Sequence, residues 1–169
     1  MRDALTLDIP GRGRLRLDVL VLDYNGTIAG GGVLLPGVSE RLRRLARKME
    51  IHVLTADTFG TVRSALEQEW GTDGLVVDIL PPREARPYRD EGQAKLSVVE
   101  RLGRQRCCAI GNGRNDTLML EAAALSFGVL GREGAWFAAL ARADIVVTDV
   151  LDALDLLLDP RGIVATLRN

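Results

Sequence analysis

Val19 to Leu22 are four consecutive aliphatic residues that run directly into Asp23 and the turn Asn25-Gly26-Thr27. A run without polar alternation is typical of a strand buried on both faces, as in parallel sheets. Asp23 then lies at the carboxyl end of that strand, where open α/β sheets bind their ligands. A carboxylate at this position, followed by small turn residues with exposed amides, is suited to a nucleophile that faces a phosphate group.

Strands and helices alternate along the rest of the chain. Apolar runs predict strands over 51–54, 75–80, 106–110, 126–130 and 144–147, and the segments between them predict helices over 38–49, 61–70, 93–102, 117–124, 134–141 and 150–158, with a last helical turn over 163–167. Residues 4–9 and 14–18 alternate apolar and polar side chains, which predicts an N-terminal edge hairpin. Gly30 to Gly32 predict a second, small hairpin beside Asp23. The pattern indicates an α/β fold with a doubly wound, mostly parallel sheet.

Length and composition bound the kind of protein. The 169 residues predict a single domain over 1–169, long enough to bury its own core. With a net charge of −1, the chain shows no bulk attraction for nucleic acid or membrane surfaces, and its apolar runs are far shorter than a membrane span. Cys107 and Cys108 are adjacent and are predicted to point to opposite faces of one strand as reduced thiols. Together with the absence of a signal peptide, these features predict a cytoplasmic protein.

Polar residues suited to one site lie at or near four strand ends. They are Asp23, Thr55, Lys95 on the helix after the third strand, and the turn from Asn112 to Asp116. A phosphoryl-transfer site needs a nucleophile, a phosphate anchor, a cation against developing charge and a metal ion. Asp23 is the nucleophile candidate, Thr55 the anchor and Lys95 the cation. Asp23 and Asp116, with an amide oxygen, supply the oxygen ligands that Mg²⁺ prefers.

These residues carry a resemblance to a known family. Asp-Tyr-Asn-Gly-Thr from Asp23, Leu-Thr-Ala-Asp from Leu54, Lys95, and Gly-Asn-Gly-Arg-Asn-Asp from Gly111 resemble, in order, the four motifs of the haloacid dehalogenase (HAD) superfamily. The nearest subgroup is that of the soluble phosphatases similar to P-type ATPases, whose later Ala-Asp-Ile-Val resembles residues 143–146. The resemblance spans about residues 19–158 and implies a HAD-like, Rossmannoid fold.

The resemblance also implies an activity and a site. It implies a Mg²⁺-dependent phosphohydrolase that acts on a small phosphorylated metabolite through an aspartyl-phosphate. No segment is long enough for a cap domain, and capless members often borrow a neighbouring subunit, so a homo-oligomer is expected. The implied phosphate-binding residues are Asn25, Gly26, Thr55, Ala56, Lys95 and Asn115, and the implied magnesium ligands are Asp23, Asn25 through its carbonyl, Asn112 and Asp116.

Two positions depart from the family pattern. Asn25 stands where these phosphatases place a general acid/base aspartate, and an amide cannot protonate a leaving group or activate water. That role is usually worth about 10²–10⁴ in rate, so slow turnover is expected. Asn112 replaces a metal-binding aspartate and offers Mg²⁺ a neutral oxygen.

Two other functions stay open. Asn25 and Asn112 together fit a non-catalytic or regulatory phosphate-binding domain that retains the scaffold. A phospho-accepting receiver also uses Asp, Thr and Lys on a doubly wound sheet. Receivers, however, carry an acidic pair after the first strand and the acceptor after the third, unlike this chain.

Several conspicuous residues are interpreted as structural. His52 lies mid-strand and is predicted to be packed in the sheet, and Trp70 and Trp136 are predicted to pack in helices. Asp57 is predicted to cap the helix that follows it. Residues 81–90, rich in proline and arginine, are predicted to be an irregular surface loop.

Overall fold

The computed structural model describes residues 3–57, 60–70, 75–80 and 90–169. Its centre is a six-stranded sheet in the order β10-β9-β8-β3-β6-β7, and every neighbouring pair in it is parallel. The strands are β3 (Val19–Asp23), β6 (Glu50–Thr55), β7 (Leu75–Ile79), β8 (Cys107–Gly111), β9 (Leu125–Val129) and β10 (Ile145–Val147). The predicted α/β fold is confirmed, and the Val19 to Leu22 run is buried in the middle of it.

The strand order reverses beside β3. From β3 the chain proceeds outward through β6 to β7, and then returns to the other side of β3 to add β8, β9 and β10. Ligands of open α/β sheets bind at the carboxyl ends of the strands where such a reversal occurs. Asp23, Thr55 and Gly111 end the three strands that meet at this point.

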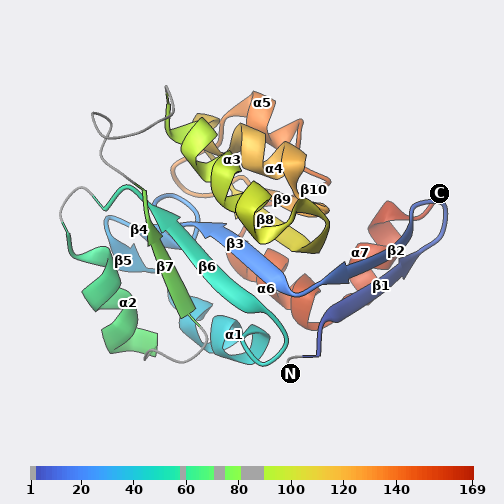
Figure 1. Cartoon of the computed structure of the whole chain (residues 1–169), viewed down its shortest axis with the longest axis horizontal. Helices are drawn as coiled ribbons and strands as arrows, with labels where there is room; N and C mark the ends of the chain where they lie inside the picture. Colours follow the sequence, from blue (N-terminus) through green and yellow to red (C-terminus); the bar gives the residue numbers. More distant parts are fainter. Residues whose placement is uncertain (1–2, 58–59, 71–74, 81–89) are drawn as a thin grey trace.

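Helices cover both faces of the sheet (Figure 1). One face packs on α3 (Glu91–Leu102), α4 (Thr117–Ala122) and α5 (Phe137–Leu140), whose buried side chains join Val19 and Val21 in one apolar cluster. The other face packs on α1 (Val38–Leu45), α2 (Val62–Trp70), α6 (Val150–Leu158) and α7 (Arg161–Leu167), with Leu20 and Leu22. Cys107 belongs to the first cluster and Cys108 to the second, as predicted for adjacent residues of one strand.

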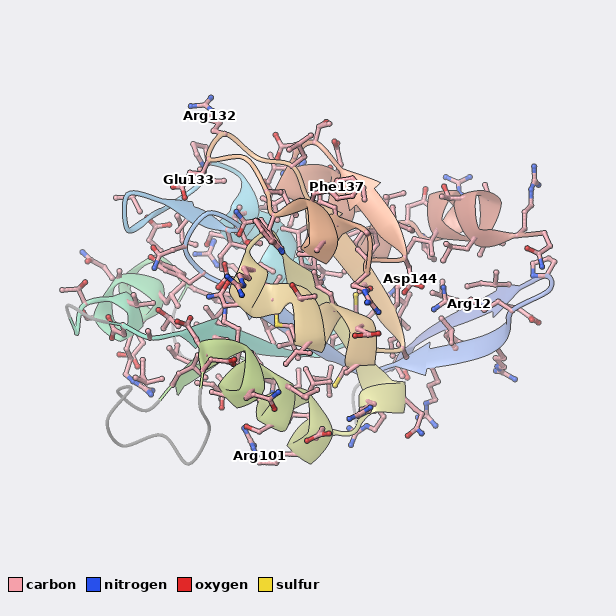
Figure 2. All side chains as sticks on the ribbon, turned by 90° about the horizontal axis from the view of Figure 1, so that it is seen from above. Arg12, Arg101, Arg132, Glu133, Phe137 and Asp144 are labelled. Atoms are coloured by element: carbon pink, nitrogen blue, oxygen red, sulfur yellow. The ribbon has the colours of Figure 1, made fainter. Side chains whose placement is uncertain are left out.

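Two hairpins stand outside the central sheet. The predicted N-terminal hairpin forms from β1 (Leu5–Ile9) and β2 (Gly13–Leu17) as a separate two-stranded sheet. An ion pair of 2.8 Å from Arg12 to Asp144 ties its turn to the start of β10 (Figure 2). The second hairpin, β4 (Ala29–Gly30) and β5 (Val33–Leu34), follows Asp23 directly and confirms the prediction from the three glycines.

One predicted helix is much shorter than expected. The segment 134–141 forms a helix only over α5, because residues 131–136 are instead a loop held against Asn112 by two hydrogen bonds. Trp136 is consequently 50 % exposed, so the prediction that it packs inside a helix is wrong, whereas Trp70 and His52 are buried as predicted.

Further sequence predictions concern loops and membrane spans. Asp57 caps α2 as predicted, since its Oδ1 accepts hydrogen bonds from the amides of Thr61 and Val62. The loop predicted over 81–90 lies outside the described residues except for Asp90, which caps α3. Among the described helices, none has the length and apolar character that crossing a membrane requires.

Candidate active site at the carboxyl edge of the sheet

A buried lysine joins two aspartates at the carboxyl edge of the sheet. Lys95 lies on α3 with its side chain completely buried, and its Nζ donates to Asp23 Oδ1 at 2.5 Å and to Asp116 Oδ1 at 2.7 Å. Asp23 is the last residue of β3, and Asp116 ends the short 3-10 helix η3 (Arg114–Asp116) after β8. Three segments far apart in the chain are thereby joined beneath one point of the sheet edge.

The charges in this cluster do not balance. Burial raises the pKa of Asp23 from 3.8 to about 7, since the attraction of Lys95 offsets only part of the desolvation and Asp116 adds repulsion. Burial also lowers the pKa of Lys95, but Asp23 and Asp116 outweigh it and hold that pKa above its ordinary value. The ammonium therefore stays charged while two carboxylates compete for it, and the cluster favours a further cation.

Asp116 is held on both of its oxygens. Its Oδ1 accepts from Lys95, and its Oδ2 accepts from the backbone amides of Asn112 and Gly113 at 2.9 and 2.8 Å. A Cβ on Gly111 would lie 2.6 Å from Asp116 Cγ, so only glycine allows this close packing. Asp116 thus fixes both the lysine and the turn that carries Asn112.

Thr27 links the nucleophile candidate to Asn112. Its hydroxyl lies 3.1 Å from Asp23 Oδ2 and 3.2 Å from Asn112 Oδ1, and one hydroxyl proton can serve only one of these two acceptors. The two oxygens therefore converge on one place with a single donor between them. Oxygen atoms that converge in this way suit a hard divalent cation.

The predicted Mg²⁺ would find two side-chain oxygens here, Asp23 Oδ2 and Asn112 Oδ1. Within the described residues, no three His, Cys, Asp or Glu side chains are grouped so as to hold a metal ion. Asp23 Oδ2 and Asn112 Oδ1 still fit Mg²⁺, which often binds through one or two protein oxygens and keeps several waters. The other predicted carboxylate ligand, Asp116, already accepts hydrogen bonds on both oxygens, so a direct bond to a metal would compete with Lys95.

The remaining predicted residues lie around this cluster. Thr55 is buried at the end of β6, and its Oγ1 accepts from the amide of Asp57 at 3.0 Å, which places Ala56 inside a tight turn. The side-chain amide of Asn115 donates to Glu91 at 2.9 Å on α3. Asn25 is exposed and borders a cavity of about 610 Å³ beside Asp57, Thr61 and the glycines of the small hairpin.

Sequence reasoning missed two residues at this edge. Thr27 belongs to the motif after Asp23, and its spacing of four residues was a usable signal for the bond between them. Glu133 comes from the loop after β9 and lines the same cavity as Asn25. No periodicity or motif marks it, because only the fold brings that loop over Gly26.

Gly26 leaves room for these side chains. It has φ +79°, and a Cβ there would lie 2.9 Å from Asn112 Nδ2 and 3.0 Å from Glu133 Oε2. A side chain would therefore be strained by its backbone and would displace both neighbours.

No family model matches the chain. Two uncharacterized proteins of Methanocaldococcus jannaschii are similar to it in sequence. One is 45 % identical over 86 residues, which cover 48 % of this chain and 92 % of that protein. The other is 50 % identical over 40 residues, which cover 24 % of this chain and 91 % of that protein.

Solved structures share the fold at low sequence identity. The 3-deoxy-D-manno-octulosonate 8-phosphate phosphatase of Moraxella catarrhalis, solved with magnesium, phosphate and KDO, superposes with a TM-score of 0.59 and 14 % identity over 88 % of this chain and 90 % of that one. The structure of a HAD-superfamily (subfamily III A) hydrolase from Legionella pneumophila superposes with a TM-score of 0.63 and 14 % identity, over 89 % of this chain and 87 % of that one. The catalytic domain of the CPx-ATPase CopB-B superposes with a TM-score of 0.55 and 21 % identity, over 74 % of this chain and 46 % of that one.

The sheet order and these superpositions define the class: the chain has the fold of the HAD superfamily. Within that class it belongs to the same family as the first of the two uncharacterized archaeal proteins.

Proposed function

We propose that the chain is a Mg²⁺-dependent phosphohydrolase that acts on a small phosphomonoester through an aspartyl-phosphate on Asp23. The observation that carries the proposal is the buried Lys95 between Asp23 and Asp116, at the strand reversal of the sheet. Burying one cation with two carboxylates is costly, and such an arrangement is typical of functional sites. Solved relatives in fold, such as the phosphatase crystallised with magnesium and phosphate, support the same reaction class.

The residues divide the reaction between them. A carboxylate oxygen of Asp23 attacks phosphorus, and Lys95 neutralises charge on the phosphoryl oxygens and keeps Asp23 oriented. Thr55, with the amide of Ala56, anchors the phosphate together with the amide of Asn25, while Asn115 holds α3 against the turn after β8. The amide of Gly26, also predicted from the sequence to bind phosphate, already donates to Ala29 O at 2.8 Å. Asp116 anchors Lys95 and the Asn112 turn, in place of the direct metal bond predicted from the sequence.

Asp23, Asn112 and the backbone carbonyl of Asn25 would hold Mg²⁺. When bound, the ion supplies positive charge beside the phosphate oxygens, which the unbalanced cluster of two carboxylates and one ammonium accommodates. The neutral Asn112 oxygen makes this a weaker site than one built from a second carboxylate.

The experiment is Mg²⁺-dependent hydrolysis of 4-nitrophenyl phosphate by the wild type, Asp23→Asn and Asp18→Asn. Asp18 precedes β3, at the opposite end of the strand from Asp23, and pairs with Arg106 at 2.7 Å, so its variant is a matched control for loss of one carboxylate. Activity is expected in the wild type and in Asp18→Asn, and loss to background in Asp23→Asn. Equal background rates in all three contradict an enzyme.

The same samples test the second candidate function. The amides at Asn25 and Asn112 favour a regulatory phosphate-binding domain that retains the scaffold. Such a domain binds beryllium fluoride with Mg²⁺ but turns over no phosphate ester. Binding without turnover would therefore select it over the phosphohydrolase.

We further propose that the protein is a cytoplasmic homo-oligomer in which a neighbouring copy covers the open site. No cap segment lies between β3 and α1 or, in the described part, between β6 and α3. Light scattering at micromolar concentration tests this, and a monomeric mass contradicts it.

A further inference from the structure

The inference rests on the proposed function: a phosphohydrolase needs a group that moves protons, and the residue at the position implied for that group is Asn25. Asn25 stands next to the phosphate-binding turn and cannot supply a proton to a leaving alkoxide or take one from water. General acid/base catalysis of this kind is usually worth about 10²–10⁴ in rate. Two carboxylates, those of Asp57 and Glu133, line the cavity that Asn25 borders.

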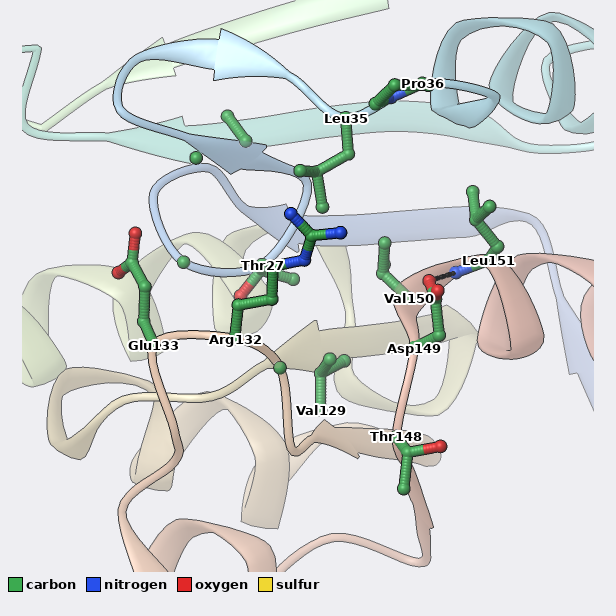
Figure 3. Close-up of a pocket in the computed structure, with 14 residues that line it drawn as sticks. Thr27, Leu35, Pro36, Val129, Arg132, Glu133, Thr148, Asp149, Val150 and Leu151 are labelled. Carbon is green, nitrogen blue, oxygen red and sulfur yellow. Dashed lines mark hydrogen bonds between the residues drawn. The ribbon is translucent and has the colours of Figure 1, made fainter.

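Glu133 lies beside Gly26, the residue that follows Asn25. Its Oε2 is 3.0 Å from the position that a Cβ on Gly26 would occupy, and both Asn25 and Glu133 line the cavity of about 610 Å³ at this edge. In Figure 3 the Arg132 side chain passes over Thr27, while Glu133 extends to the other side, away from Asp149. The carboxylate thus lies beside the turn that contains Asn25 and Gly26.

The loop that carries Glu133 is anchored to the site. Asn112 Nδ2 donates to Gly134 O at 3.3 Å, the amide of Trp136 donates to Asn112 O at 2.9 Å, and the amide of Gly134 donates to Gly131 O at 2.9 Å. The guanidinium of Arg114 stacks 5.8 Å from the Trp136 ring centroid. Asn112, which also faces Asp23 through Thr27, therefore holds the backbone that follows Glu133, and the bond from Gly134 to Gly131 closes the turn that carries Glu133.

Within the described residues the Glu133 carboxylate has no partner, whereas the Asp57 carboxylate has two. Glu133 forms no hydrogen bond or ion pair with any residue in the described ranges, and its side chain is exposed. Asp57 is the other carboxylate lining this cavity, but its Oδ1 already accepts the amides of Thr61 and Val62 at 2.9 and 3.0 Å. Of the two, only Glu133 can exchange a proton without breaking a helix cap.

We propose that Glu133 is the general acid/base of this site in place of the missing aspartate. In the first step its carboxylic acid gives a proton to the ester oxygen as the bond from that oxygen to phosphorus breaks and the Asp23–phosphorus bond forms. In the second step the Glu133 carboxylate takes a proton from water as the water oxygen attacks phosphorus, which releases phosphate and restores the Asp23 carboxylate. The two steps consume one ester and one water and return Glu133 to its acid form.

The experiment compares Glu133→Gln with Glu121→Gln under two phosphoryl donors. Glu121 is exposed on α4 and pairs with Arg142, so its variant makes the same chemical change outside the site. An alkyl phosphate needs an acid for its leaving group, whereas acetyl phosphate does not, since acetate leaves as a stable anion. Hydrolysis is measured as kcat and KM, and the covalent intermediate as the mass increase of the Asp23 peptide.

We expect Glu133→Gln to lower kcat for the alkyl phosphate about 10²-fold with little change in KM, and to leave labelling by acetyl phosphate at the wild-type rate. The label should also persist longer, because the base of the second step is gone. Glu121→Gln should match the wild type throughout. The double variant Asn25→Asp with Glu133→Gln should recover turnover, since it restores an acid at the family's usual position.

Other outcomes overturn the inference. If Glu133→Gln keeps the wild-type kcat, Glu133 is not the acid/base. If labelling and hydrolysis fall equally, Glu133 acts only through its charge on substrate binding. A wild-type protein that is neither labelled nor active overturns the proposed function itself, and the role of Glu133 with it. Normal labelling in Glu133→Gln together with unchanged decay overturns the inference alone.

Discussion

Two clusters of charged side chains lie on the same sheet, and they are built in opposite ways. The edge cluster consists of Asp23, Lys95 and Asp116, whose side chains are 10 %, 0 % and 0 % exposed. The strand cluster consists of His52, Asp78 and Arg101, where Asp78 accepts from His52 Nδ1 at 2.6 Å and from Arg101 at 2.9 Å. Arg101 reaches it from α3 with a side chain that is 58 % exposed, on a different side of the molecule from Glu133 (Figure 2).

The difference lies in the balance of charge. In the strand cluster the Asp78 carboxylate has two donors, and water reaches the outer one, Arg101, so this carboxylate is satisfied without any ligand. A second carboxylate, Glu50 Oε1, lies 3.1 Å from His52 Nε2. In the edge cluster two carboxylates share one ammonium away from water. Stability alone does not favour such a cluster, so its presence at the strand reversal indicates a function.

Removing the cation from each cluster should have very different effects. Lys95→Met leaves two buried carboxylates uncompensated and should lower the free energy of unfolding by about 3–5 kcal/mol. Arg101→Met removes an exposed partner and should cost about 0–1 kcal/mol. Urea midpoints at pH 7 compare the two variants. Equal losses would mean that the edge cluster is no more strained than the strand cluster.

The nucleophile candidate should limit the stability of the metal-free protein. Because the folded pKa of Asp23 is raised from 3.8 to about 7, the folded state binds more protons than the unfolded state between these values, and stability falls as pH rises through this window. Asp23→Asn lacks this ionisation and should be roughly 2–4 kcal/mol more stable than the wild type at pH 8.

The measurement is urea unfolding with EDTA from pH 4 to pH 8. The excess stability of Asp23→Asn should be near zero at pH 4 and should reach its plateau above pH 7. A gain that does not vary with pH would show that packing, and not ionisation, separates the two proteins. A variant less stable than the wild type at pH 8 would contradict the strained cluster.

The edge of the sheet was predictable because apolar runs fix where strands end. The uninterrupted Val19 to Leu22 run and the run before Thr55 place both polar residues at one edge by the geometry of parallel strands alone. Lys95 was harder, since nothing in a helical pattern distinguishes a lysine that is buried under a strand from one on the surface. Lys95 was assigned to the site by the order of the motifs, and only the structure shows its hydrogen bonds to Asp23 and Asp116.

The positions of Glu133 and Trp136 could not be predicted from the sequence pattern. The segment 134–141 has enough alanine and aromatic residues for a helix, but hydrogen bonds to Asn112 hold its first part as a loop. A tertiary contact here overrides local propensity, exposes Trp136 and brings Glu133 to Gly26. Such contacts join residues with no fixed spacing, so they leave no sequence signal.

Ionisation of Asp78 should change the free energy of unfolding with pH in the direction opposite to that of Asp23, and by a smaller amount. Burial raises the pKa of Asp78, but the hydrogen bonds and charges of His52 and Arg101 outweigh it and lower that pKa below 3.8. A lowered folded pKa stabilises the protein above the unfolded value, and this contribution is lost as pH falls through the folded pKa. Asp78→Asn should therefore be about 1 kcal/mol less stable than the wild type at neutral pH, with the difference closing below pH 4. Urea midpoints of both proteins from pH 3 to pH 7 measure this. If the stability difference between the wild type and Asp78→Asn instead grows as the pH falls, Asp78 is a strained carboxylate like Asp23. The contrast between the two clusters then no longer holds.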